Sequence, residues 1–205
     1  MDATLKQKES QGFQLIELVI VLALLGLITA FAVPDLLRAT AAQRVRLAAG
    51  EIAGIFQRGR MEAIRRGGNV AVKFRDQDDG TYTYTLYRDG DADGVLNQDI
   101  DLGIDSALSQ PRRLEQVGGN VGFGLPTAFV PRDPANPRRR LDHLEDPIRF
   151  NRSDLASFGP LGTATPGTVY ITDHQDHLAA VRLLGPTGRV QVLYYDPDLD
   201  QWSRR

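Results

Sequence analysis

Acidic residues at alternate positions give this chain its clearest candidate for a binding site. The segment 89–101 reads DGDADGVLNQDID, in which Asp89, Asp91 and Asp93 precede a glycine. This spacing lets several carboxylate oxygens converge on one hard cation, because the glycine permits the sharp turn that a calcium loop requires. The remaining ligands would be the Val95 carbonyl, Asn97, Asp99 and Asp101. The pattern therefore predicts a calcium ion, weakly bound, as the candidate cofactor.

The match to such a loop is incomplete at its closing position. The segment resembles the loops of EF-hand and dockerin proteins, in which the closing acid would stand at Ile100, whereas this chain has acids at Asp99 and Asp101. The sequence shows no clear helix after the loop. A solvated acidic hairpin loop is the alternative interpretation, and the sequence leaves both open.

A second candidate is a single acid inside an apolar run. Residues 13–33 read FQLIELVIVLALLGLITAFAV, and Glu17 is the ionisable side chain among them. About 21 residues at about 1.5 Å each are long enough to span the hydrocarbon core of a bilayer as a helix. A carboxylate there costs about 2–3 kcal/mol on insertion scales, so it predicts a functional role and a cationic partner.

The residues that precede the apolar run suggest this partner. Gly12 is followed by Phe13, and the segment Gly12–Leu18 (GFQLIEL) resembles the class III signal of type IV prepilins and type II secretion pseudopilins. The resemblance implies that a prepilin peptidase cleaves after Gly12 and that Phe13 is methylated. It also implies that Glu17 pairs with the amine of a neighbouring subunit. A secretory signal peptide or a simple membrane anchor would not explain these residues together.

We expect Glu17 and the rest of the apolar run to belong to one long helix. Pro34 follows the apolar run, and we expect a kink or local melting there, where many pilins have a proline. Residues 34–67 have an apolar stripe at helical spacing, and Gly67 with Gly68 predicts the helix end. The stripe consists of Val45, Ala48, Ile52, Ile55, Phe56 and Ala63.

The remainder of the chain predicts β structure. Alternating or apolar segments indicate strands at 69–75, 81–88, 148–150, 168–172, 178–184 and 189–195. A loop at 185–188 joins the last two. We expect residues 89–147 to be a largely irregular insertion, with one short strand near 121–125.

This layout resembles the GspH/FimT class of minor pseudopilins and pilins. The resemblance rests on RMEAIRRG at 60–67 running into a strand, and on GTVYI at 167–171 with its two following strands. The expected fold class is α+β. The expected parts are a leader (1–12), a transmembrane and filament-core helix (13–33), its amphipathic continuation (34–67), and an antiparallel β-sheet domain (68–205) on which the helix packs.

Other clusters of polar residues are weaker candidates for a binding or catalytic site. The segment DHQDH at 173–177 has metal-ligand types, but Asp and His are ordinary turn residues between strands. Arg138–Arg140 and Arg204–Arg205 are basic, whereas the 205-residue chain has a net charge of −2, so we do not expect DNA binding. The chain has no cysteine, which excludes disulfides and thiolate metal sites. We find no nucleophile–base or phosphate-loop motif and do not expect an enzyme.

The sequence therefore predicts a minor pseudopilin or pilin subunit of a type II secretion or type IV pilus system. By resemblance it is a single-pass protein of the cell inner membrane with a periplasmic C-terminal domain. Its expected partners are prepilin peptidase, other pilins or pseudopilins, the inner-membrane assembly platform and membrane lipid. The alternative function is a minor pilin that acts as a DNA receptor in DNA uptake.

Overall fold

The computed structural model describes residues 15–151 and 153–204. The chain divides into two compact units, Met1–Thr40 and Ala41–Arg205, and helix α1 (Leu15–Arg66) has residues in both. The helix continues through Pro34 without a break, so the local melting expected there does not occur. One lost backbone hydrogen bond is tolerated because the segments on both sides are rich in helix-favouring Leu and Ala.

The second part of α1, from Ala41 onward, buries its apolar stripe. All six predicted stripe residues are buried, and Ala48, Ile52, Phe56 and Ala63 are fully inaccessible. The helix ends where the glycines predict. Gly67 has φ 66°, and the backbone N–H groups of Gly67 and Gly68 donate to the carbonyls of Ile64 and Ala63, both at 3.3 Å.

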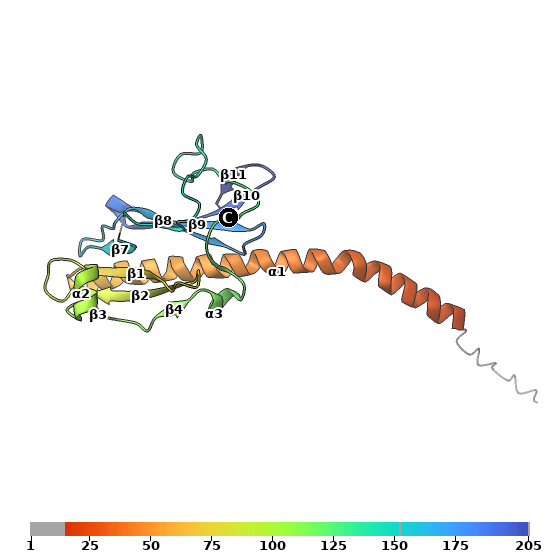
Figure 1. Ribbon diagram of the computed structural model, residues 1–205, viewed down its shortest axis with the longest axis horizontal. Helices are drawn as coiled ribbons and strands as arrows, with labels where there is room; N and C mark the ends of the chain where they lie inside the picture. The colour runs from red at the N-terminus through yellow and green to blue at the C-terminus, as the bar shows by residue number, and fades with distance from the viewer. Residues whose placement is uncertain (1–14, 152, 205) are drawn as a thin grey trace, which may run out of the picture. The chain divides into compact units, whose positions relative to one another are not determined.

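The strands of this unit form two antiparallel sheets (Figure 1). The first sheet has the order β3-β2-β1-β7, with β4 also paired to β2. Its strands are β1 (Val70–Asp76), β2 (Tyr82–Arg88), β3 (Ser106–Ala107), β4 (Arg112–Arg113) and β7 (Leu155–Phe158). The predicted α+β class with antiparallel strands is confirmed.

The second sheet has the order β11-β10-β9-β8-β5, with β6 also paired to β8. Its strands are β5 (Gly122–Phe123), β6 (Ile148–Arg149), β8 (Gly167–Thr172), β9 (Leu178–Leu184), β10 (Arg189–Asp196) and β11 (Gln201–Ser203). The predicted loop between β9 and β10 contains a short 3-10 helix, η1 (Gly185–Thr187).

Phe56 on α1 connects the helix to both sheets. Its ring lies 6.2 Å from the rings of Phe74 in β1 and Phe158 in β7, and 5.7 Å from the ring of Phe150, which follows β6. These residues belong to one hydrophobic core to which both sheets contribute. The helix is therefore fixed to the sheets by interlocked aromatic packing, which favours edge-to-face rings at these distances.

The segment 89–147 has more regular structure than we expected. It contains α2 (Asn97–Leu102), β3, β4, α3 (Glu115–Gly118) and β5, of which β5 matches the short strand predicted near 121–125. Strands of two residues show no periodicity in the sequence. Their positions come from partners far along the chain, such as Leu86, whose carbonyl accepts from the Leu108 N–H at 2.7 Å.

Candidate functional site

Part of α1 has the length and apolar character needed to cross a membrane. The segment Leu15–Val33 qualifies by length and composition, and none of its apolar window is buried within the protein. Leu15 is 81% exposed and Phe31 72%. The Thr29 hydroxyl donates within the helix to the Leu25 and Gly26 carbonyls at 2.9 and 3.0 Å. The polar hydroxyl is thus satisfied internally, whereas the apolar side chains require an external apolar environment.

Glu17 is the charged residue of this segment. Its side chain is exposed and has no ion-pair partner within residues 15–151 and 153–204. The cleavage site predicted at Gly12 and Phe13 lies outside the described residues. Processing, methylation and the Glu17 pair therefore stay predictions.

The acidic loop, defined as residues 89–105, brings three predicted ligands together. Asp89, Asp91 and Asp93 each offer a carboxylate oxygen, and these oxygens lie within 4.8 Å of one another. Asp89 organises the turn, because its carboxylate accepts from the backbone N–H groups of Asp91, Ala92 and Gly94 at 3.2, 2.7 and 3.0 Å.

The charge of Asp89 is stabilised by these contacts. Burial alone would raise the pKa of this carboxyl, but the hydrogen bonds from Asn69 and from the loop backbone hold it below its usual value. The Asn69 amide donates to Asp89 Oδ2 at 2.8 Å. Asp89 therefore stays ionised, and four hydrogen bonds hold its carboxylate at the start of the loop.

Asp105 closes the loop, and sequence reasoning missed it. Its Oδ1 accepts from the Gly90 N–H and its Oδ2 from the Leu96 N–H, both at 2.9 Å, and the residue is 2% exposed. A Cβ at Gly90 would lie 2.1 Å from the Ile104 carbonyl oxygen, so this position requires glycine. No local signal marks Asp105, because its partners lie 15 and 9 residues earlier in the chain.

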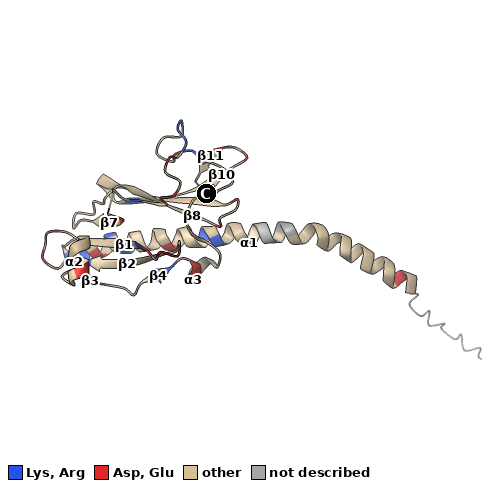
Figure 2. Ribbon diagram, in the orientation of Figure 1, with Lys and Arg blue, Asp and Glu red and all other residues tan. Residues whose placement is uncertain are grey.

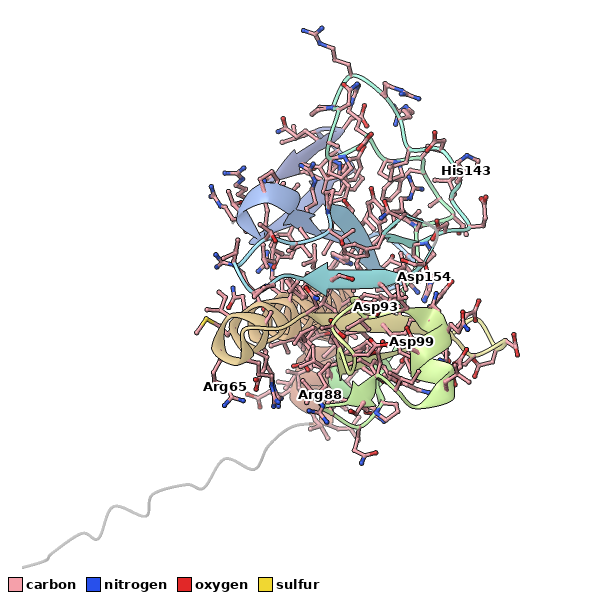
Figure 3. The ribbon with its side chains drawn as sticks, turned by 90° about the vertical axis from the view of Figure 1, so that its left-hand side faces the viewer. Arg65, Arg88, Asp93, Asp99, His143 and Asp154 are labelled. Atoms are coloured by element: carbon pink, nitrogen blue, oxygen red, sulfur yellow. The ribbon has the colours of Figure 1, made fainter. Side chains whose placement is uncertain are left out.

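Asp99, on helix α2, lies beside the three clustered acids. It is 9% exposed, and its carboxylate has no hydrogen-bond or ion-pair partner in the part of the chain that the structure describes. Burial, followed by repulsion from Asp91, Asp105 and Asp89, raises its pKa. Figure 3 shows Asp99 and Asp93 in the same region of the loop.

Asp93 experiences the same crowding of negative charge. A hydrogen bond shared with Asp91 is the largest cause that raises the pKa of Asp93, followed by burial and by the charges of Asp91, Asp99 and Asp89. No Lys or Arg within the described residues pairs with these clustered acids. Within the described residues, the side chains of Asp91, Asp93 and Asp99 therefore have no cationic partner.

Two other predicted ligands, Asn97 and Asp101, have different side-chain partners. The Val95 side chain is 5% exposed and packs with Ala71 and Leu155. The Asn97 amide donates to the Ser153 carbonyl at 3.3 Å. Asp101 forms an ion pair with Arg75 at 3.1 Å. The side chains of Asn97 and Asp101 are thus engaged elsewhere, and Asp101 is not part of the cluster.

The histidine cluster is a closed turn. The Asp173 carboxylate accepts from the backbone N–H groups of Gln175 and His177 at 3.0 Å and contacts the His177 ring at 2.6 Å. Burial opposes ionisation of Asp173, but the His177 contact and these backbone bonds hold its pKa below the usual value. This arrangement favours the turn interpretation.

Two arginines of the basic cluster at 138–140 have acidic neighbours. Arg140 pairs with Asp200 at 3.1 Å, Arg139 lies 4.0 Å from Asp142, and Arg205 is outside the described residues. Figure 2 shows Lys and Arg positions interspersed with Asp and Glu positions along the second unit.

An apolar helix of membrane-spanning length that continues into an antiparallel α+β unit defines a pilin-like protein. The family model described as type II transport protein GspH matches residues 48–188, more than half of the chain, and the chain belongs to this family of minor pseudopilins. Neither the curated proteins nor the solved structures contain a match. Because the match lies entirely within the second unit, it supports the family independently of the N-terminal signal. It gives no support to the DNA-receptor alternative.

Proposed function

We propose that this protein is a structural subunit of a periplasmic pseudopilus in a type II secretion system. It is held in the inner membrane by residues 13–33, with the following domain in the periplasm, and is cleaved after Gly12 by prepilin peptidase before assembly. The observation that supports this role most directly is the GspH family match, together with the exposed apolar segment Leu15–Val33. The neighbouring pseudopilins and the inner-membrane assembly platform are its partners.

The apolar segment has two successive environments in this proposal. In the precursor, lipid surrounds the exposed side chains of Leu15–Val33. In the pseudopilus, the helices of neighbouring subunits cover them, because apolar surface that leaves lipid must not enter water. The same residues thus serve as membrane anchor and as filament core.

Glu17 selects the position of each incoming subunit. A lone carboxylate and a lone ammonium are each costly in the bilayer. When the Glu17 carboxylate of one subunit meets the amine at Phe13 of another, both costs are removed by one contact. Pairing is possible after cleavage, since the uncleaved leader occupies that amine in a peptide bond.

The first experiment tests processing. The full chain is co-produced with a prepilin peptidase in a bacterial inner membrane, and its N-terminal peptide is analysed by mass spectrometry. We expect a chain that begins at Phe13 with one added methyl group. An assembled protein that retains its first 12 residues would refute the proposal.

The second experiment tests the charge pair. We expect Glu17→Gln to insert into the membrane normally and to form far fewer cross-links to partner pseudopilins. Thr29→Val is the matched control, because its hydroxyl is bonded within the helix and offers nothing to a neighbour. Equal cross-linking by Glu17→Gln and the unmodified chain would show that the carboxylate does not direct docking.

A further inference from the structure

The first residues of strand β10 form a sheet edge that no other strand covers. On one side of β10, residues Arg189–Tyr194 pair with β9. On the other side, β11 pairs with Tyr194–Asp196, and no strand of the described residues pairs with Arg189–Leu193 there (Figure 1). Unpaired backbone groups at a sheet edge are a template for a further strand.

The backbone groups of Val190 and Val192 point outward at this edge. The Ser203 hydroxyl on β11 donates to the Tyr194 carbonyl at 3.4 Å, so this carbonyl points toward the β11 side. Alternate residues of a strand direct their N–H and C=O groups to the same edge, so those of Val190 and Val192 follow Tyr194. Within residues 15–151 and 153–204, these groups have no hydrogen-bond partner.

The chain covers its other long strands more completely. On the side away from β9, β8 pairs with both β5 and β6. On the side away from β1, β2 pairs with both β3 and β4. Proteins usually protect an edge that stays open with proline or with inward-pointing charges, whereas the open edge of β10 has Val190 and Val192.

The side chains at this edge are apolar and incompletely buried. Val190, Val192 and Tyr194 pack against the core that contains the stripe of α1, but each is only partly buried. An additional strand beside β10 would cover the exposed part of the two valines, which is favourable because it removes apolar surface from water.

Two arginines of α1 lie beside the ends of this edge. The Arg46 guanidinium lies over the Tyr194 ring, 5.8 Å from its centroid. At the other end, a Cβ on Gly188, the residue before β10, would lie 2.8 Å from Nε of Arg60. The helix therefore runs alongside β10 and places a positive charge near each end of the open edge.

Two further arginines lie on the strands themselves or next to them. Arg189 is the exposed first residue of β10. Arg204 follows β11, and its Nε and Nη2 donate to the Gln191 amide oxygen at 2.7 and 2.6 Å when that oxygen faces them. None of these four arginines has an ion-pair partner in the part of the chain that the structure describes. Charge complementarity therefore favours an acidic partner.

We propose that the open edge of β10 binds an acidic, extended segment of a partner protein as an additional antiparallel strand. The segment pairs with the backbone of Val190 and Val192, and its apolar side chains cover these valines. Its acidic side chains alternate with the apolar ones and lie beside the arginines. In this mode of recognition, main-chain hydrogen bonds supply affinity and alternate side chains supply specificity. This proposal does not depend on the role of the protein in secretion.

The experiment titrates the purified full chain in detergent micelles into a fluorescein-labelled peptide of sequence EVEVEVE. Binding is measured by fluorescence anisotropy. We expect saturable binding of this peptide and none of KVKVKVK, because the edge is surrounded by arginines.

Two methylated peptides test backbone pairing. In an antiparallel pair, the peptide valines opposite Val190 and Val192 direct their N–H groups to β10. Methylation of the valine nitrogens should therefore weaken binding at least about fivefold, since hydrogen bonds are lost. Methylation of the glutamate nitrogens is the matched control and should leave the affinity unchanged.

Variants of the protein locate the site. Val192→Pro removes an N–H that points away from β9, so the fold should be retained, which thermal circular dichroism checks, and peptide binding should be lost. Arg189→Gln should weaken binding about two- to fivefold, as expected for one exposed charge. Arg58→Gln is the matched control and should bind normally. Arg58 is exposed and two residues from Arg60, so it points to a different side of α1.

Three outcomes would overturn the proposal. Equal affinity of both methylated peptides and the unmodified peptide would mean that charge alone attracts the peptide. Equal weakening by Arg58→Gln and Arg189→Gln would place the peptide elsewhere. Binding of duplex DNA that is lost in Arg189→Gln, without binding of EVEVEVE, would make the edge a nucleic-acid site instead.

Discussion

Gly59 packs closely against side chains of β7 and β2, and its replacement by alanine should cancel or reverse the usual stabilising effect of alanine in a helix. A Cβ at Gly59 would lie 2.8 Å from Cε2 of Phe158 and 3.3 Å from Cδ1 of Leu86. Phe158 is 1% exposed and its ring packs on Phe56, so it has no space into which to move. Overpacking of this kind costs about 1–3 kcal/mol.

Gly54 on the same helix provides the matched control. A Cβ there meets no atom within 4 Å. Glycine to alanine in a helix interior gains about 1 kcal/mol from propensity, so Gly54→Ala should stabilise the protein by about that amount. The same gain applies at Gly59, so the difference between the two variants isolates the overpacking cost of about 1–3 kcal/mol.

Thermal unfolding of the full chain in micelles measures this difference. For a unit of this size, about 2 kcal/mol corresponds to roughly 4–8 °C in melting temperature. We expect Gly54→Ala to melt above the unmodified chain and Gly59→Ala to melt below Gly54→Ala by about this interval. Equal stabilisation by both variants would refute the close packing of α1 on β7.

The remaining predictions concern three other clusters. Asp173→Asn should lower the melting temperature at pH 7. The pKa of Asp173 is depressed by folding, so its contribution is present above the ordinary Asp value of about 3.9 and is lost at lower pH, where the two melting curves should converge. Asp105→Ala should cost about 1–3 kcal/mol in chemical denaturation, because it removes a buried carboxylate that accepts hydrogen bonds from two partly buried backbone N–H groups. Asp101→Ala, which removes an exposed ion pair, should cost less than about 1 kcal/mol. The full chain should not retard duplex DNA at physiological salt; a salt-sensitive complex that disappears when Arg138–Arg140 are replaced would contradict this.

The long elements could be predicted because their patterns are local. The stripe of α1 repeats over several turns and its end carries two glycines, while β1, β2, β9 and β10 have seven or eight residues each. Strands β7 and β11 were not predicted. They have four and three residues, and β7 is defined by its pairing with β1, about 80 residues earlier. Pairing over such distances leaves no periodic signal in the sequence.

The acidic loop shows the same division. The spacing of Asp89, Asp91 and Asp93 predicted their convergence, because alternate residues before a glycine turn back on themselves. The spacing could not assign Asp101 to Arg75 or reveal Asp105, since both depend on how the chain returns to the sheet. The local turn can thus be predicted from the sequence. Which of the nearby acids converge, which pair with an arginine and which accept backbone N–H groups depends on the tertiary structure.

The pairing of β7 with β1 also has a consequence for the order of events during synthesis. Val70 pairs with Phe158, and the hydrophobic core that contains Ile52 and Phe56 includes strand residues as far along the chain as Leu183. The chain is made from its N-terminus, so the apolar segment of α1 is complete more than one hundred residues before the core can close. Folds dominated by such distant pairings form slowly. In the proposed membrane setting, the apolar segment Leu15–Val33 is therefore inserted while the apolar stripe farther along α1 still lacks its sheet partners. The nascent chain then needs protection from aggregation until β9 has been synthesised.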